Sequence, residues 1–216
     1  YHSVREYPNF SEVISLLLAE IRSSCGFQHS PKRVCFAVAC PTNSEHISFT
    51  NSHWEFSKTE LLCGLGCQSL AIINDFEAIA HGISDLKLSD HVKIGGGSNI
   101  ANSPMAILGP GTGLGVSAIV PVKNGYHVID SEGGHADFAP VGDVQTLVLS
   151  YLSKKYERVS LERLLSGDGM MNIYLALCDS YNETPRFTSS AEVVQAGNEE
   201  TCPISKLTLS LFCEIL

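Results

Sequence analysis

The chain is poor in basic residues and contains no long apolar segment. Its 14 Lys and Arg residues stand against 23 Asp and Glu residues, which leaves a formal net charge of −9. A protein that binds DNA or RNA needs a basic surface to neutralise phosphates, so we expect no nucleic acid partner. No apolar run is long enough to span a bilayer and no signal peptide is visible, so we expect no membrane partner and a cytoplasmic location.

Patterns typical of metal sites and disulfide frameworks are also lacking. The eight cysteines are scattered along 216 residues, a length that needs no covalent staples, and we interpret them as reduced thiols. Cys63 and Cys67 have His53 nearby, but no second ligand pair follows at the spacing of a metal site. A packing role is therefore favoured over a zinc site, and we assign no metal ligand.

The glycine-rich segment 109–115, with the sequence GPGTGLG, matches neither common nucleotide-binding fingerprint. It lacks the Lys-Ser/Thr pair of a P-loop, and it lies between two predicted strands instead of opening a helix. Two interpretations remain, a tight hairpin or a turn whose backbone N–H groups bind a phosphate. Thr112 places a hydroxyl donor between two glycines, which favours the phosphate-binding turn.

Strands and helices alternate in the predicted secondary structure. Apolar patterning predicts strands at residues 33–39, 46–50, 70–73, 105–108, 116–122 and 126–129. It predicts helices at residues 9–24, 75–83, 143–155, 160–165, 169–180 and 189–196. Ser57 and Glu60 have the spacing of a capping box, which predicts a further helix that ends near Gly64. This order of elements indicates an α/β architecture repeated in two lobes.

We place the two lobes at residues 1–84 and 85–216, with the chain passing between them within residues 84–103. The first residue is not methionine, and the chain stops inside the apolar run 207–216 without a helix-ending signal. We therefore expect it to be part of a longer protein.

Asn74 and Asp75 lie where a buried strand is predicted to end and a helix to begin. Open α/β sheets place ligand sites at such junctions. The alternative is a helix N-cap, a position where Asn and Asp are preferred. An ionised carboxylate here can accept a proton from an attacking hydroxyl, which makes Asp75 a candidate general base.

Glu132 and His135 are separated by two glycines, so both side chains can turn toward one small polyhydroxy ligand. A surface turn and half of a metal site are the alternatives, although the His-Glu-x-x-His spacing of zinc proteases is absent. Glu162 is a further carboxylate in the first turn of a predicted helix. By itself it would be interpreted as solvated helix surface.

Taken together, these residues resemble the bacterial glucokinase family of the hexokinase and actin-like ATPase superfamily. The similarity lies in segments 37–41 (AVACP), 50–54 (TNSHW), 73–76 (INDF), 111–115 (GTGLG), 132–140 (EGGHADFAP) and 162–167 (ERLLSG). The resemblance implies a two-lobed, actin-like (ribonuclease H-like) ATPase fold, present in part.

The resemblance also implies a role for each candidate residue in phosphorylation of D-glucose by ATP. Asp75 would be the general base for the glucose 6-hydroxyl and would also contact the sugar. The other sugar-binding residues would be Asn74, Glu132, His135 and Glu162. The phosphates of ATP would meet Gly111, Thr112 and Gly113, with Mg²⁺ bridging them.

Two motifs of the family have no counterpart in this chain. They are the first phosphate loop, Asp-x-Gly-Gly-Thr, and the glycine pair near the adenosine, so the segment alone is expected to transfer phosphate poorly or not at all. The alternatives are a kinase for another hexose, a sugar-responsive regulator and a non-catalytic sugar-binding module. The regulator is disfavoured because neither a DNA-binding helical module nor a zinc cluster is visible. A homodimer is left open.

Overall fold

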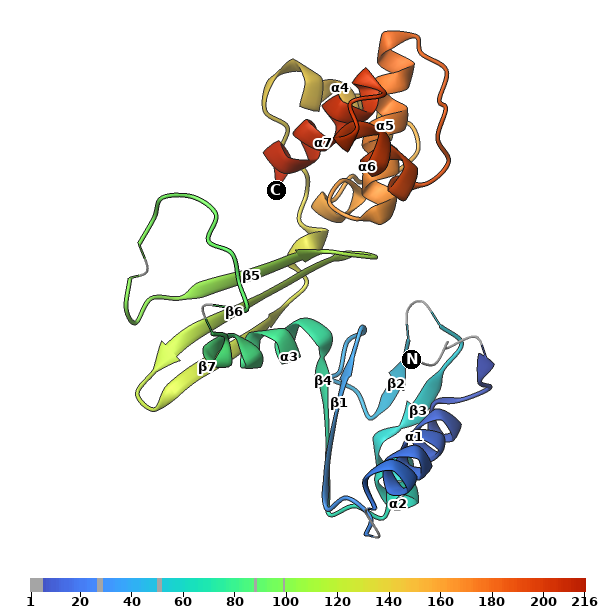
Figure 1. Cartoon of the computed structure of the whole chain (residues 1–216), viewed down its shortest axis with the longest axis vertical. Coiled ribbons are helices and arrows are strands. Elements are labelled where there is room, and N and C mark those ends of the chain that lie inside the picture. The colour runs from blue at the N-terminus through green and yellow to red at the C-terminus, as the bar shows by residue number, and fades with distance from the viewer. Residues whose placement is uncertain (1–5, 27–28, 50–51, 88, 99) are drawn as a thin grey trace. The chain divides into compact units, whose positions relative to one another are not determined.

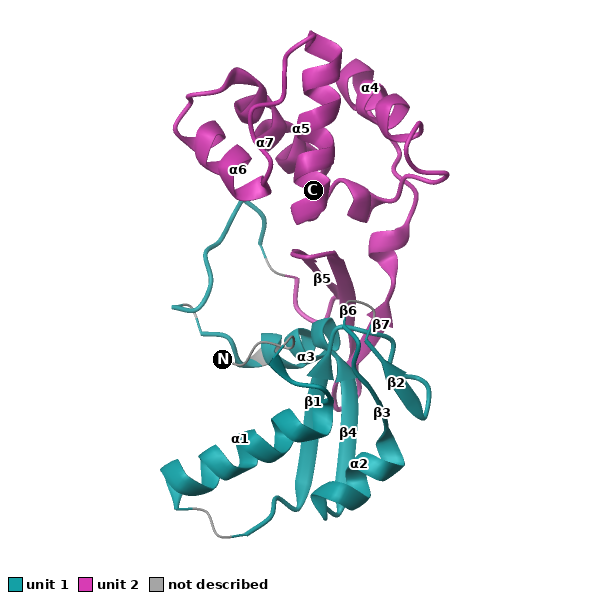
Figure 2. Cartoon of the chain, turned by 90° about the vertical axis from the view of Figure 1, so that its right-hand side faces the viewer, with its two compact units in different colours: residues 1–99 teal, residues 100–216 magenta. Residues whose placement is uncertain are grey.

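The computed structural model describes residues 6–26, 29–49, 52–87, 89–98 and 100–216 (Figure 1). The chain divides into two compact units, unit 1 at residues 1–99 and unit 2 at residues 100–216 (Figure 2). The division lies within residues 84–103, where the chain is predicted to pass between the lobes, and after residue 84, where the first lobe is predicted to end. Residues 86–87 and 89–98 form no helix or strand, so no element signal marks the boundary more closely.

Unit 1 contains two small sheets. β1 (Arg33–Val38) pairs with β4 (Ser69–Asn74) in parallel, and the last pair in this register is Val38 with Asn74. Parallel strands end at the same edge of a sheet, so the residues that follow β1 and β4 lie next to each other. β2 (His46–Ser48) and β3 (Glu55–Ser57) form an antiparallel pair. Of the strand predicted at 46–50, Thr50 lies outside the described residues.

The helices of unit 1 begin and end at local signals in the sequence. Asn9 caps α1 (Phe10–Cys25) through a 2.9 Å bond from the Glu12 N–H to its side-chain oxygen, and Gly26 ends α1 with φ +66°. Because only glycine adopts this left-handed conformation without strain, the predicted stop is confirmed. Three helices follow α1 in the described part of unit 1: α2 (Lys58–Leu65), α3 (Asp75–Gly82) and the short 3₁₀ helix η2 (Ile83–Asp85).

The N-terminus of α2 corrects one detail of the sequence prediction. Ser57 is the cap, since its hydroxyl oxygen accepts the N–H of Glu60 at 3.1 Å. The carboxylate at this cap comes from Glu45, whose Oε1 accepts bonds from the Ser57 hydroxyl and the Thr59 N–H, both at 2.8 Å. The capping box predicted for Ser57 and Glu60 is therefore only half present.

An aromatic cluster forms the core of unit 1. The ring of Phe10 stacks on Phe56 at 4.7 Å and meets the edges of Phe36 at 5.2 Å and Trp54 at 5.7 Å. These rings come from α1, β1 and the segment around β3, so the cluster holds α1 against both sheets.

Unit 2 begins with an antiparallel sheet in the order β5-β6-β7. The strands are β5 (Met105–Pro110), β6 (Leu114–Val122) and β7 (Gly125–Ser131). Val122 pairs with Gly125, so the predicted Asn-Gly hairpin is confirmed, with Gly125 at φ +118°. Pairing of β5 with β6 continues to Pro110 and Leu114, which narrows the glycine segment to a three-residue turn at 111–113.

A helical layer follows the sheet in the sequence. Its elements are η3 (Gly133–His135), α4 (Gly142–Leu152), η4 (Leu161–Arg163), α5 (Gly167–Tyr181), α6 (Ser190–Asn198) and α7 (Pro203–Ile215). The α-helix predicted at residues 160–165 is wrong, because this segment forms only the three-residue η4. Residues of α4, α5 and α7 form one core cluster, in which Val148, Leu152, Ile173 and Leu177 are fully buried.

Candidate functional site

Asn74 and Asp75 lie at the predicted junction between a strand and a helix. Asn74 ends β4 and caps α3: its side-chain oxygen accepts the N–H groups of Phe76 at 2.8 Å and Glu77 at 3.4 Å. Glu77 returns a bond to the Asn74 N–H at 3.3 Å, which completes a capping box. The N-cap interpretation is therefore correct for Asn74, and Asp75 occupies the first helical position beside it.

The carboxylate of Asp75 is half-buried at the carboxyl ends of the two parallel strands. One neighbour is Cys40, which follows β1 and is 4% exposed. Burial raises the pKa of the Cys40 thiol, and the negative charge of Asp75 raises it further. Because Val38 pairs with Asn74, Asp75 follows β4 at the same sheet edge at which the chain leaves β1, and α/β folds bind ligands at this edge.

In unit 2, the structure brings Glu132, His135 and Glu162 together. The imidazole of His135 lies between the two carboxylates, with Nε2 3.6 Å from Glu132 Oε2 and Nδ1 3.9 Å from Glu162 Oε1. The side chain of Glu132 is 68% exposed, that of His135 is 56% exposed and that of Glu162 is 31% exposed. They can therefore exchange contacts with water for contacts with a ligand.

Backbone pairing between two loop segments produces this arrangement. The N–H of Leu161 donates to the carbonyl of Ala136 at 2.9 Å, and the N–H of Phe138 donates to the carbonyl of Val159 at 2.9 Å. Asp137 and Ser160 form an isolated antiparallel bridge between these bonds. The loop after β7 and the loop before η4 thus run side by side, which puts Glu162 next to His135.

The glycine turn at 111–113 lies against the same loops. The N–H of Gly111 donates to the carbonyl of Gly113 at 2.7 Å, so the segment is a tight hairpin turn, one of the two interpretations. The carbonyl of Gly111 accepts the N–H of Gly167 at the start of α5 at 2.9 Å. Thr112 is exposed at the tip. The turn therefore lies near the N-terminus of a helix, where backbone N–H groups favour anions.

Arg158 is a further site residue that the sequence analysis did not single out. Its guanidinium donates to the backbone carbonyl of His135 and forms an ion pair with Asp137. Both partners precede it by more than twenty residues, so no local motif indicated this contact. The bonds hold the backbone of His135 against the loop that leads to Glu162.

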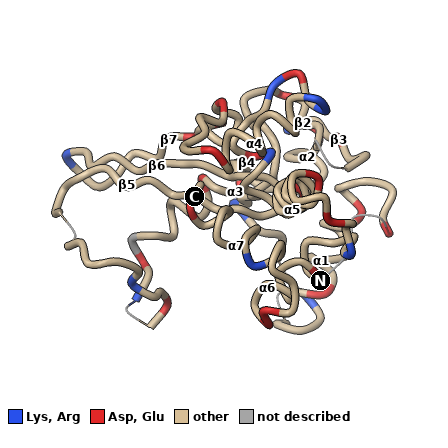
Figure 3. The backbone as a smooth tube through the Cα atoms, turned by 90° about the horizontal axis from the view of Figure 1, so that it is seen from above, with Lys and Arg blue, Asp and Glu red and all other residues tan. Residues whose placement is uncertain are grey.

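Other features of the described residues do not form a second site. No group of three or more His, Cys, Asp or Glu side chains in the described ranges could hold a metal ion. Cys63 is exposed, and the ring of His53 contacts the backbone carbonyl of Tyr7 at 3.1 Å. Lys and Arg are spread singly or in pairs along both units (Figure 3). No helix within the described part of the chain has the length and apolar character needed to cross a membrane.

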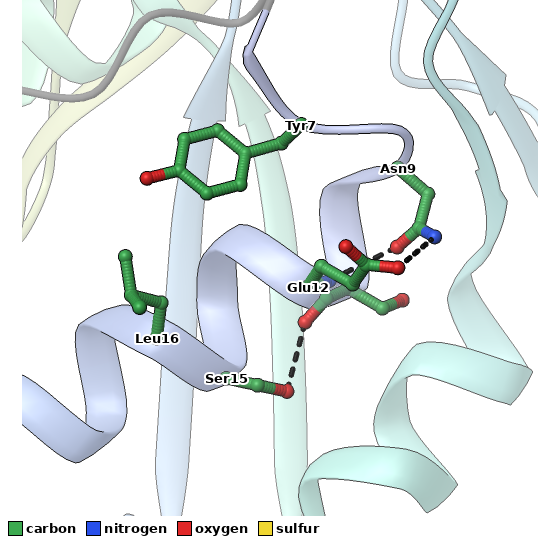
Figure 4. A pocket seen from close by; sticks show the side chains of 6 residues that line it. Tyr7, Asn9, Glu12, Ser15 and Leu16 are labelled. Atoms are coloured by element: carbon green, nitrogen blue, oxygen red, sulfur yellow. Dashed lines mark hydrogen bonds between the residues drawn. The ribbon is translucent and has the colours of Figure 1, made fainter.

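Among the residues that line a hollow at the start of α1, the side chains of Asn9, Glu12 and Ser15 already make hydrogen bonds (Figure 4). The Nδ2 of Asn9 donates to Glu12 at 3.1 Å, and the hydroxyl of Ser15 donates to the carbonyl of Ser11 at 2.9 Å. These bonds belong to the cap and the first turns of the helix, so we assign this hollow no ligand.

Comparison with known proteins identifies close relatives of the chain. The family model described as Glucokinase matches residues 1–216. Curated glucokinases from Hahella chejuensis and Colwellia psychrerythraea are 36% and 38% identical over 97% and 100% of this chain. The chain spans 64% and 66% of the length of these two relatives.

Solved structures of glucokinases share the fold of this chain. The crystal structure of a glucokinase from an Antarctic psychrotroph matches 99% of this chain and 65% of its own, with a TM-score of 0.82 and 30% identity. A glucokinase from Balamuthia mandrillaris in complex with glucose matches 94% of this chain and 62% of its own, with a TM-score of 0.71 and 23% identity. The predicted α/β class with an actin-like ATPase fold, present in part, is thereby confirmed.

Proposed function

Because this chain belongs to the glucokinase family, we propose that the protein of which it forms part transfers the γ-phosphoryl group of ATP to the 6-hydroxyl of D-glucose. The observation that carries the proposal is the cluster of Glu132, His135 and Glu162 beside the glycine turn. It combines groups suited to a polyhydroxy ligand with a backbone turn suited to phosphate.

The chemistry of the cluster fits a sugar. Carboxylates only accept hydrogen bonds, whereas an imidazole can donate or accept, so the three side chains match hydroxyls that do both. We assign the sugar hydroxyls to Glu132, His135 and Glu162 in unit 2 and to Asn74 in unit 1. The Asn74 oxygen caps α3, so its NH₂ group is the part that would contact the sugar.

We assign Asp75 as the general base that accepts the proton of the 6-hydroxyl as the oxygen attacks phosphorus. Phosphoryl transfer asks for a base held in position more than for an unusual pKa. The first turn of α3 and the ends of β1 and β4 provide that position. The step forms an oxygen–phosphorus bond to glucose and breaks the bond to ADP.

Gly111, Thr112 and Gly113 are assigned to the phosphates of ATP. We expect Mg²⁺ to arrive with the nucleotide, because this ion keeps several waters and binds phosphates more readily than all-protein cages. When bound, the ion neutralises charge that develops on the transferred group. We locate the reaction in the cytoplasm.

Residues outside this chain complete the proposed enzyme. The chain spans 64% and 66% of the relatives from Hahella and Colwellia, so we infer that the segment alone transfers phosphate poorly or not at all. Positioning and charge stabilisation supply most of the catalysis in phosphoryl transfer, and an incomplete nucleotide site weakens both.

The test uses Asp75→Asn in the full-length protein. Loss of a general base is expected to lower kcat by about 10² to 10⁴-fold, while the dissociation constant for glucose changes only a few-fold because the amide still contacts the sugar. Asp85→Asn is the matched control, since Asp85 is an exposed carboxylate in η2. Full activity of Asp75→Asn would overturn the assignment.

A further inference from the structure

The two carboxylate oxygens of Glu162 face two different parts of the candidate site. Oε1 lies 3.9 Å from Nδ1 of His135, on the side assigned to the sugar. Oε2 accepts the backbone N–H of Leu114 at 3.0 Å, directly after the glycine turn. One side chain therefore contacts both the sugar side and the phosphate side.

The Glu162 carboxylate lies in the space that a side chain on residue 113 would enter. A Cβ atom on Gly113 would lie 2.4 Å from Oε2 and 3.2 Å from the carboxyl carbon of Glu162. A Cβ on Gly111 at the other end of the turn would meet no atom within 4 Å. A side chain at position 113 would therefore have to displace the flexible end of the Glu162 side chain.

Each end of the turn makes a hydrogen bond to another segment of the chain, and its middle is left for a ligand. Glu162 holds Leu114 on one side, and the N–H of Gly167 holds the carbonyl of Gly111 at 2.9 Å on the other. The backbone of Glu162 is itself anchored, because its carbonyl accepts the hydroxyl of Ser166 at 2.8 Å. These contacts use neither the N–H of Thr112 nor that of Gly113.

We propose that Glu162 is a positioning residue that links sugar binding to the conformation of the phosphate turn. The inference rests on the proposed function, in which the sugar contacts His135 and the turn contacts ATP. A sugar hydroxyl bound at Oε1 restrains the Glu162 carboxylate. The restrained carboxylate holds the backbone N–H of Leu114, and this contact holds the conformation of the turn. Glucose therefore tightens nucleotide binding, and the nucleotide tightens glucose binding by the same factor, since such coupling is reciprocal.

The test measures nucleotide binding in the full-length protein with and without saturating glucose. Calorimetry with a non-hydrolysable ATP analogue is expected to show a dissociation constant that glucose lowers by roughly 5-fold or more. Glu162→Ala brings this ratio close to one. Glu132→Ala is the matched control, because it removes the other carboxylate beside His135. It is expected to weaken glucose binding but to keep the ratio of nucleotide dissociation constants measured without and with saturating glucose.

Gly113→Ala provides a second, independent variant. Its new methyl group displaces the Glu162 carboxylate without removing it, so this change in the phosphate turn is expected to weaken glucose binding and to reduce the coupling ratio. Thermal unfolding shows whether each variant is folded. If Glu162→Ala does not fold, the coupling ratio of Gly113→Ala tests the role of Glu162.

The outcomes separate this inference from the proposed function. A wild-type protein that binds neither glucose nor nucleotide overturns both. A wild-type protein that binds both ligands independently, or a folded Glu162→Ala or Gly113→Ala variant that keeps the wild-type ratio, overturns only the role of Glu162.

Discussion

At the scale of single residues, Gly134 is required by a contact with a residue that lies far away in the sequence. A Cβ on Gly134 would lie 2.1 Å from the backbone carbonyl oxygen of Leu114, so the loop after β7 and the start of β6 approach too closely for any side chain. The position of this glycine is visible in the sequence, but the backbone segment that approaches it could not be predicted from the sequence.

We predict that Gly134→Ala lowers the free energy of unfolding by about 1–3 kcal/mol, because backbone atoms must move to relieve the clash. Gly64→Ala is the control: it lies inside α2 with no atom within 4 Å of the new Cβ, and it is expected to stabilise by about 0.5–1 kcal/mol. Urea unfolding of both variants checks the contrast. Equal stability of the two variants would contradict it.

Asn74 combines two roles that substitution can separate. Asn74→Ala removes the cap of α3 and is expected to cost about 1 kcal/mol of stability as well as glucose affinity. Asn74→Asp keeps a good cap but loses the NH₂ group, so it is expected to weaken glucose binding at nearly unchanged stability. Thermal unfolding and glucose titration of the two variants check this. If Asn74→Asp binds glucose like the wild type, Asn74 is only a cap.

At the scale of elements, secondary structure was predicted well wherever the signal was local. Asn9 and Gly26 delimit α1, and the Asn-Gly pair forms a hairpin. Prediction failed for α7, whose buried positions include Ser205 and Thr208, because polar residues on the packed face hide the apolar period. The short strand β3 was also missed, since three residues carry little periodicity.

The cap of α2 predicts a pH effect. Hydrogen bonds from the Thr59 N–H and the Ser57 hydroxyl hold the pKa of Glu45 below its usual value. A carboxylate with a lowered pKa in the folded state stabilises the protein above its unfolded pKa, and this contribution is lost as the pH falls through the folded value. The stability difference between wild type and Glu45→Gln is therefore expected to be largest near neutral pH and to shrink below about pH 4.

Glu60→Gln is the control for this measurement, because Glu60 was the carboxylate that the sequence predicted at the cap. Urea unfolding midpoints of the three proteins are compared from neutral to acidic pH. A pH-dependent loss in Glu60→Gln, with none in Glu45→Gln, would contradict the observed cap and restore the predicted one.

At the scale of the whole molecule, the chain consists of two units with separate cores. Phe10 and Phe56 belong to the core of unit 1, and Leu152 and Ile173 belong to that of unit 2. The resemblance to a family predicted the candidate residues in both units. It did not predict the contacts of Glu162 with Leu114 and of Arg158 with His135, which join segments far apart in the sequence. Local patterns carry no information about such contacts.

We predict that trypsin first cuts the chain after Lys87 or Lys93, which are exposed between η2 and β5, where residues 86–87 and 89–98 form no helix or strand. Each unit has its own core, so two protease-resistant fragments are expected, and mass spectrometry identifies their ends. First cuts after Lys154 or Lys155 instead would show that unit 2 opens before the segment between the units is cleaved.

The most direct test of the proposed sugar site is a calorimetric titration of the folded protein with glucose, with galactose for comparison and His135→Ala as the variant. We expect the protein to bind glucose in preference to galactose and His135→Ala to lose this binding, because the imidazole lies between the carboxylates of Glu132 and Glu162. A folded protein that binds neither sugar, or a His135→Ala variant that binds glucose like the wild type, would contradict the proposed sugar site.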